Sequence, residues 1–226
     1  MITDNLYSCS FNPENISCCG LSSLTTTNSY TSSPSFIQTS TTVSETTTPA
    51  PVGPCNCGIP NKPNRIFGGN ETEPNEYPWV VFLSIGGTSL CGGSIIGDRH
   101  VLTAAHCVDG TTTASDLSVY VGTHDRTRPA KIVSVSTIDI HPTWTGSALT
   151  GSDSAVLTLS ETLEFSETVR PLCLSVDPSS SYAGQAAVAS GWGLDDSNAI
   201  PNNLRDVDVE IISNDECRNT WSFVKE

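Results

Sequence analysis

The stretch "SIIGDRHVLTAAHCVDG", residues 94–110, decides how this chain is interpreted, because it surrounds one histidine with small residues. His106 follows two alanines and precedes Cys107. A general base needs an imidazole that is held in one tautomer and that a reactant can approach, and small neighbours leave room for that approach. A histidine beside a cysteine can equally be a structural residue or a metal ligand. These residues alone leave all three roles open.

The cysteines indicate disulfides and therefore a secreted, extracellular protein. The chain has 226 residues, with nine Cys and one Met. So many cysteines are typical of proteins that fold in an oxidising compartment. Because their number is odd, at least one thiol has no partner within the chain. A bond between Cys91 and Cys107 would tie the segment of His106 to the preceding strand, and closing a loop of that size typically contributes about 3 kcal/mol.

Composition and charge exclude several kinds of partner. The formal net charge is -14, and no Lys or Arg precedes Lys62. Nucleic acids and anionic membranes require a basic surface, so we expect neither as a partner. No apolar run approaches the length of a membrane span. The first ten residues show no signal-peptide pattern, although the cysteines demand secretion, so we expect the natural start to lie upstream.

A low-complexity segment separates two parts of the chain. Residues 21–54 contain 18 Ser or Thr and four Pro among 34 residues, with no basic residue. Such a segment cannot bury enough apolar surface to offset its loss of conformational entropy. We therefore predict a disordered Ser/Thr/Pro-rich linker that is suited to O-glycosylation; an ordinary long loop is the alternative.

Short apolar runs after Pro54 predict an all-β domain. They are rich in β-branched residues and are separated by Gly, Pro, Asp and Asn, as strands are. No segment shows a sustained helical period. The class is therefore a sandwich or a barrel. The runs are residues 77–85, 117–123, 130–140, 154–160 and 206–213.

The quoted stretch and its surroundings resemble the chymotrypsin/trypsin-like serine endopeptidases. The motifs are "CGGSIIGDRHVLTAAHC" with "RIFGGNETEPNEYPWVV" before it and "HPTW", "DSAVLTL", "RPLCL" and "GWG" after it. The likeness runs from about Cys55 to the end. It implies two antiparallel Greek-key β-barrels in residues 66–226: most of the first in residues 66 to about 172, and an incomplete second in 173–226.

The same resemblance implies roles for two site residues. His106 would be the general base, and Asp153 in "GSDSAVLTL" would be the carboxylate that orients it. The other acids near it in sequence are interpreted as solvated turn residues: Asp109, Asp116, Asp125 and Asp139. We expect no cofactor and no metal, since "RTRPAK" and Thr123 do not fit the calcium loop of some relatives.

Residues 55–65 resemble a zymogen activation segment. Arg65 precedes Ile66, whereas Lys62 precedes Pro63, which trypsin-like enzymes cleave poorly. The resemblance therefore implies cleavage at Arg65–Ile66 by a trypsin-like activating protease. It also implies that Cys57, or less readily Cys55, bonds to Cys173 and keeps the propiece attached. A protein substrate and a serpin-type inhibitor are the other expected partners.

The nucleophile of this family lies in Gly-Asp-Ser-Gly-Gly, and residues 1–226 contain no such motif. The segment "NDECRNTW" resembles the one that precedes the nucleophile loop, so we expect this chain to be inactive and the enzyme to require residues beyond Glu226. The partner of Cys217 is expected there too. Ala187 stands where many relatives have a cysteine.

Residues 1–20 resemble the closing half of a clip-type disulfide module, in which Cys18 and Cys19 need partners other than each other. The sequence does not identify the partners of Cys9, Cys18, Cys19 or Cys55. Asn15 and Asn70 lie in N-glycosylation sequons, which are frequent by chance.

Two classes of function follow. One is a secreted serine endopeptidase zymogen, and the other is a non-catalytic homologue that binds or regulates. A binding module has no physical reason to keep both His106 and Asp153, so the pair favours the enzyme.

Overall fold

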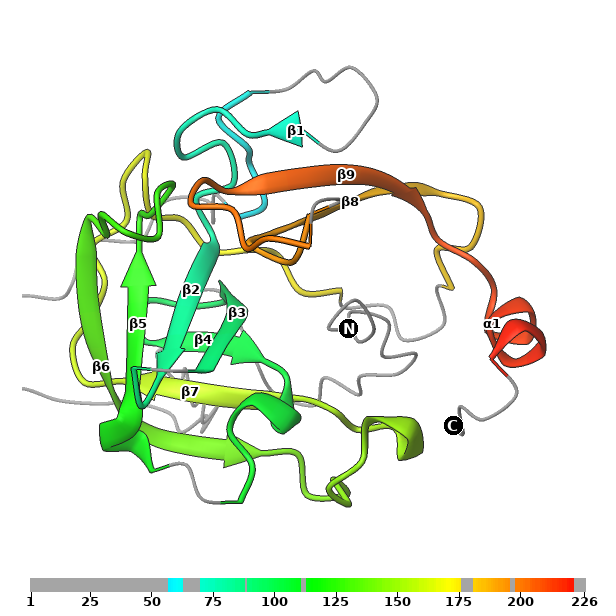
Figure 1. Ribbon diagram of the computed structural model, residues 1–226. Coiled ribbons are helices and arrows are strands. Elements are labelled where there is room, and N and C mark those ends of the chain that lie inside the picture. Colours follow the sequence, from blue (N-terminus) through cyan, green and yellow to red (C-terminus); the bar gives the residue numbers. More distant parts are fainter. Residues whose placement is uncertain are drawn as a thin grey trace, which may run out of the picture.

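The computed structural model describes residues 57–62, 70–87, 89–110, 113–175, 181–195 and 198–221, and these residues form a fold that is almost entirely β (Figure 1). The predicted linker of residues 21–54, the clip-like residues 1–20 and the Arg65–Ile66 bond lie outside the described residues. The all-β prediction is confirmed.

Six antiparallel strands close into a barrel. Going around it, the order is β2-β3-β4-β7-β6-β5. Strands β4 and β7 pair although two strands separate them in sequence, and so do β2 and β5. The strands are β2 (Val80–Ile85), β3 (Ser89–Ile95), β4 (His100–Thr103), β5 (Leu117–Val121), β6 (Lys131–Ile140) and β7 (Ala155–Leu159).

Alternating side chains fill this barrel. In β7, Ala155, Leu157 and Leu159 are buried and the residues between them are partly exposed, which is the period of a strand with one face inward. Strand β5 follows the same pattern. Strand β2 departs from it, because four consecutive residues, Val80 to Leu83, are buried. Both faces of β2 are therefore covered.

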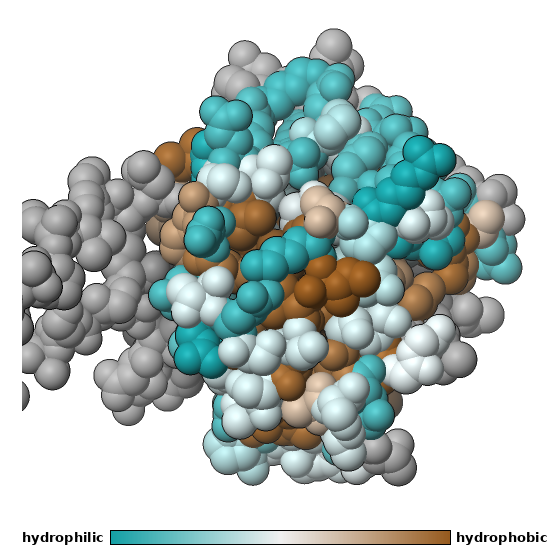
Figure 2. Space-filling view, turned by 90° about the vertical axis from the view of Figure 1, so that its left-hand side faces the viewer, coloured by the Kyte–Doolittle hydropathy of each residue, from teal (hydrophilic) through white to brown (hydrophobic). Residues whose placement is uncertain are grey.

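The cover over the outer face of β2 joins the barrel to the second sheet. Phe82 packs edge-on against Trp192, with ring centroids 5.5 Å apart, and lies 5.3 Å from the ring of Tyr120. The indole N–H of Trp192 donates to the carbonyl of His124 at 3.0 Å, so the buried polar atom is satisfied. On the face shown in Figure 2, apolar side chains lie between polar ones.

The second sheet contains β1 (Asn70–Glu71), β9 (Arg205–Glu210) and β8 (Ala186–Gly191), in the order β1-β9-β8. Within the described part of the chain, β8 pairs with β9 alone, which agrees with an incomplete second barrel. One detail of the prediction is wrong. Residues 70–71 lie on the N-terminal side of the first barrel in sequence, yet they pair with β9, because a two-residue strand is placed by its partner and carries no pattern of its own.

A short helix, α1 (Asn214–Thr220), lies beyond the second sheet in Figure 1. The sequence showed no sustained helical period, and seven residues are too few to show one. Local signals were present: Ser213 caps the helix by accepting from the backbone N–H of Glu216 at 3.1 Å, and acidic residues occupy the first turn. Among the described residues, no helix is long and apolar enough to cross a bilayer.

The two glycines of β3 give a matched test of the barrel. A Cβ atom on Gly93 would lie 2.9 Å from Val101 Cγ1 and 3.0 Å from the carbonyl oxygen of Leu102, whereas a Cβ on Gly92 would meet nothing within 4 Å. We expect Gly93→Ala to lower the free energy of unfolding by about 2 kcal/mol, as overpacking does. Gly92→Ala should change it by less than about 0.5 kcal/mol. Thermal unfolding followed by circular dichroism measures both, and equal midpoints would contradict this account of β3.

Candidate active site

The pairing of β4 with β7 brings His106 and Asp153 together. These strands are antiparallel, and Thr103 at the end of β4 lies opposite Ala155 at the start of β7. The residues just after Thr103 and just before Ala155 therefore emerge at the same end of the barrel. His106 lies there in a single turn of 3-10 helix, Ala105–Cys107. A separation of 47 residues in sequence thus becomes direct contact.

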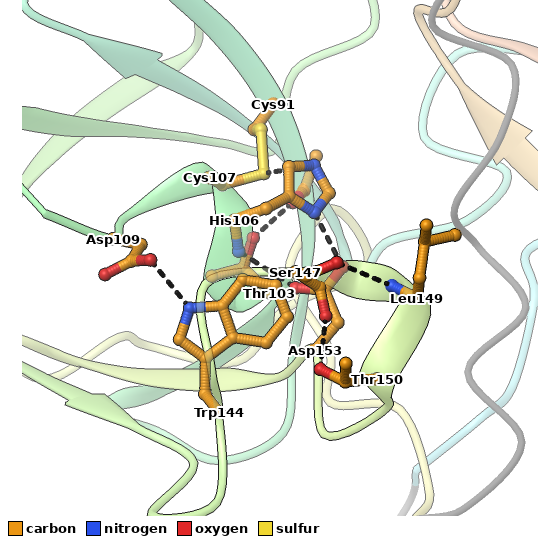
Figure 3. Close-up of polar contacts among 11 residues, drawn as sticks. Cys91, Thr103, His106, Cys107, Asp109, Trp144, Ser147, Leu149, Thr150 and Asp153 are labelled. Atoms are coloured by element: carbon orange, nitrogen blue, oxygen red, sulfur yellow. Dashed lines mark hydrogen bonds and ion pairs between the residues drawn. A yellow bond between two sulfur atoms is a disulfide. The ribbon is translucent and has the colours of Figure 1, made fainter. Parts of the chain in front are cut away.

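Asp153 binds His106 through both of its carboxylate oxygens (Figure 3). Oδ2 lies 2.7 Å from the ring Nδ1, and Oδ1 accepts from the backbone N–H of His106 at 2.9 Å. An ionised carboxylate can only accept, so the ring proton lies on Nδ1. Nε2 is then left with its lone pair. The two contacts fix both the tautomer and the orientation of the imidazole.

Burial differs sharply between the two partners. The side chain of Asp153 is 5% exposed and that of His106 is 41% exposed. A buried carboxylate that accepts two hydrogen bonds holds the ring in one orientation, and an accessible ring can meet a reactant. This is the arrangement that a general base requires.

The disulfide beside His106 excludes one of the alternative roles. Cys91, His106 and Cys107 have potential ligand atoms within 4.8 Å of one another. However, Cys91 and Cys107 form a disulfide, so neither sulfur is a thiolate that could bind zinc. His106 Nε2 lies 3.6 Å from Cys107 Sγ, but neither atom carries a proton in this arrangement, so the contact is not a hydrogen bond. The covalent bond between Cys91 and Cys107 ties the turn that carries His106 to β3.

The loop between β6 and β7 borders the site, and the sequence analysis missed its contacts. The indole N–H of Trp144 donates to Asp109 Oδ2 at 2.8 Å (Figure 3). The hydroxyl of Ser147 accepts from Leu149 N–H at 3.4 Å at the start of the short 3-10 helix Ala148–Thr150. The "HPTW" motif was quoted only for its resemblance, although Pro142 within it and Gly146 and Ser147 after it are residues that favour turns.

Of the other acids named above, Asp109, Asp116 and Asp125 lie in loops or a short 3-10 turn, whereas Asp139 lies within β6, so its interpretation as a turn residue was wrong. The backbone N–H and then the hydroxyl of Thr113 hold the pKa of Asp116 below its usual value. The hydroxyl and then the backbone N–H of Thr127 do the same for the pKa of Asp125. The contacts of Asp116 and Asp125 are local caps and turns of the kind expected for such residues.

The predicted activation segment, residues 55–65, lies partly inside the described residues. Cys57 and Cys173 form a disulfide with Cα atoms 5.0 Å apart, the first of the two pairings that the resemblance allowed. Asn61 adds non-covalent contacts, because its side-chain N–H groups donate to the carbonyls of Asn75 at 2.7 Å and Glu167 at 2.6 Å. Residues 57–62, the described part of the predicted activation segment, are thus bound to the domain.

Three predicted site residues lie outside the described residues: Arg65, Ile66 and Asn15. Asn70 is described, and it is exposed on β1. Glycosylation of Asn15 and Asn70 stays a prediction.

Together, the closed barrel, the incomplete second sheet and the His–Asp contact define the chymotrypsin-like class of serine proteases. Comparison with known proteins agrees, since residues 66–225 match the model of the Trypsin family. The chain therefore belongs to the trypsin family.

Similar proteins include trypsins and larger serine proteases. Trypsin delta of Drosophila erecta is 35% identical over 164 residues, which are 72% of this chain and 63% of that protein. Ovochymase-2 of Mus musculus is 34% identical over 158 residues, or 68% of this chain and 26% of that protein. Mannan-binding lectin serine protease 1 of Mus musculus is 30% identical over 190 residues, or 75% and 27%. The chain thus matches less than two thirds of the length of each.

Proposed function

We propose that this protein is a secreted serine endopeptidase zymogen in which His106 is the general base and Asp153 orients it. One observation carries the proposal: the nearly buried Asp153 binds both Nδ1 and the backbone N–H of the exposed His106. A carboxylate that served only as a structural cap would need the backbone contact alone. The second contact, to the ring, fixes the tautomer in which Nε2 is free to accept a proton.

In this mechanism His106 moves one proton twice. Nε2 accepts the proton of a serine hydroxyl while the serine oxygen attacks the peptide carbonyl, and the resulting imidazolium later gives the proton to the leaving amine. Asp153 stabilises the imidazolium and stays ionised throughout. No cofactor or metal is needed for these steps.

The mechanism also requires a serine nucleophile and amides that stabilise the tetrahedral oxyanion. Residues 1–226 contain no Gly-Asp-Ser-Gly-Gly. The proposal therefore requires the natural gene product to supply this motif outside these residues. Its absence there would favour the second class of function, a non-catalytic homologue that binds or regulates.

Cleavage at Arg65–Ile66 is proposed as the activating step. The alternative basic residue, Lys62, is paired with Glu73 at 3.0 Å and is followed by proline. A trypsin-like protease is the proposed activator, a serpin-type protein the proposed inhibitor and a protein the proposed substrate. The two disulfides support secretion, because such bonds persist in oxidising compartments.

Treatment of the natural gene product with trypsin tests this proposal. We expect a new N-terminus that reads Ile-Phe-Gly-Gly, and hydrolysis of peptide amides that appears in step with this cut. The fragment that contains Cys57 should stay with the domain on a non-reducing gel and leave it after reduction, because of the bond to Cys173.

Arg65→Gln is the variant that isolates the activating cut. It should block both the cut and the activity, whereas Lys62→Gln should leave both unchanged. A correctly cut protein that hydrolyses nothing and does not react with a serine-directed phosphonate would refute the enzyme proposal. Loss of the propiece without reductant would refute the tether.

A further inference from the structure

The backbone on both sides of Asp153 is held by residues 141–143, directly after β6. On the N-terminal side, the hydroxyl of Thr143 lies 2.6 Å from the hydroxyl of Ser152. On the C-terminal side, the backbone N–H of His141 donates to the carbonyl of Ser154 at 3.0 Å. We propose that Thr143 is a positioning residue that keeps Asp153 aligned with His106, an inference that rests on the proposed function.

Ser152 needs to be held, because its conformation is one that residues with side chains rarely adopt. Its φ angle is +60°, in the left-handed region that favours glycine. The N–H of Ser154 donates to the Ser152 carbonyl at 2.8 Å, which closes a tight turn around Asp153. Such a conformation persists where the surroundings hold it. The contact between the hydroxyls of Thr143 and Ser152 holds Ser152 in this conformation.

The direction of these hydrogen bonds follows from His141. The backbone N–H of Thr143 donates to His141 Nδ1 at 3.3 Å, so this nitrogen is an acceptor. The Thr143 hydroxyl lies 3.0 Å from the same nitrogen and donates to it. The Thr143 oxygen is then available to accept from the hydroxyl of Ser152. One chain of hydrogen bonds thus connects the end of β6 to the residue before Asp153.

The hydrogen bonds from His141 through Thr143 to Ser152 help to position Asp153. This position must be accurate, because Asp153 contacts two atoms of His106 at once. A small shift of a positioned catalytic group lowers the rate without changing how the substrate binds. Thr143 is exposed, so water competes for its hydroxyl and limits the effect. We therefore expect the loss of one ordinary hydrogen bond, which corresponds to about a fivefold change.

The test in the activated natural gene product is Thr143→Val, which removes the hydroxyl and keeps the shape. We expect kcat to fall about fivefold with KM unchanged. Thr143→Ser keeps the hydroxyl and should restore kcat. Thr137→Val is the matched control, since Thr137 is an exposed threonine on β6 whose hydroxyl contacts Asp139.

A second background tests whether Thr143 acts through Ser152. Glycine adopts a φ of +60° without strain, so Ser152→Gly removes the need for the Thr143 contact. In the Ser152→Gly background, Thr143→Val should therefore lower kcat by less than about twofold. Ser152→Gly also removes the hydroxyl that Thr143 contacts, so an equal loss in both backgrounds would show that Thr143 acts through a contact other than Ser152.

Proton NMR of the 226-residue chain gives a readout that needs no nucleophile. The Nδ1 proton of His106 should resonate far downfield because it is bonded to a carboxylate at 2.7 Å. We expect Thr143→Val to speed its exchange with water about fivefold, and Thr143→Ser to leave it unchanged.

The outcomes are distinct. Unchanged kcat and unchanged exchange in Thr143→Val would overturn the inference, and so would equal losses in both Ser152 backgrounds or a failure of Thr143→Ser to restore them. If instead His106→Ala kept full activity, the proposed function would fail, and the NMR exchange rate would decide the role of Thr143 by itself.

Discussion

Replacing His106 with alanine in the activated natural gene product is expected to lower kcat on the order of 10⁶-fold. The serine hydroxyl would have no base at its side, and the leaving amine would have no acid. KM should change little, because the imidazole contributes to the transition state and not to substrate binding. His100→Ala is the matched control, since His100 is an exposed histidine on β4. Steady-state kinetics on a peptide amide measures both, and a loss of less than tenfold for His106→Ala would contradict its role as the base.

Asp153→Asn extends this prediction, because asparagine has one acceptor where aspartate has two. Asp153 accepts from Nδ1 with one oxygen and from the backbone N–H of His106 with the other. In asparagine one of these atoms becomes an NH2 group, so either the backbone contact is lost or the ring adopts the wrong tautomer. In the wrong tautomer Nε2 carries the proton and cannot act as a base, so kcat should fall about 10⁴-fold.

The comparison variant for this substitution is Asp109→Asn. Among the described residues, Asp109 accepts a single hydrogen bond, which comes from the indole N–H of Trp144. The side-chain oxygen of asparagine can accept that bond as well. Its effect on kcat should stay within about threefold. A similar loss in both variants would show that the charge near the site matters and not the contact with His106.

The sequence predicted the longer strands whose apolar residues alternate or cluster, and it missed the short strands β1 and β4 as well as β3 and β8, which are rich in glycine and small residues. Strands β2, β5, β6, β7 and β9 fall in the predicted runs, whereas "SLCGGSI" of β3 and "AAVASG" of β8 show no usable pattern. Gly93 explains the difference for β3. Its missing side chain is required by a close approach to Val101, which is a property of the folded barrel and not of local propensity.

The candidate site too was predictable only where a local sequence pattern indicated it. Small neighbours made His106 a candidate base from sequence alone, but several acids were available, and the choice of Asp153 came from the family resemblance. The contact itself depends on the register of β4 against β7, in which Thr103 lies opposite Ala155. Such a non-local pairing leaves no mark in a short window of sequence. The support from Thr143 was missed because it acts between residues that lie nine positions apart in a loop.

The 226-residue chain by itself is expected to hydrolyse no peptide bond, even after cleavage at Arg65. His106 and Asp153 supply a base and its orientation, but a base accelerates nothing without a hydroxyl to activate. The serines close to Asp153 in sequence are not expected to supply this hydroxyl. Ser152 and Ser154 both adjoin Asp153 in sequence, and the hydroxyl of Ser152 is bonded to Thr143 at 2.6 Å. Loss of an oxyanion hole alone typically costs about 10²–10³-fold, and loss of the nucleophile removes the acyl intermediate altogether.

The measurement is hydrolysis of an arginine amide by the purified 226-residue chain, before and after trypsin treatment and removal of the trypsin. The His106→Ala form of the same chain is the control, and the rates of the two should be indistinguishable from each other and from buffer. Covalent labelling by a serine-directed phosphonate should likewise be absent, because no serine in residues 1–226 lies in the required Gly-Asp-Ser-Gly-Gly context. Labelling that depends on His106 would reveal a serine within these residues that serves as the nucleophile. The proposed need for residues outside them would then be wrong, while the role of His106 as the base would stand.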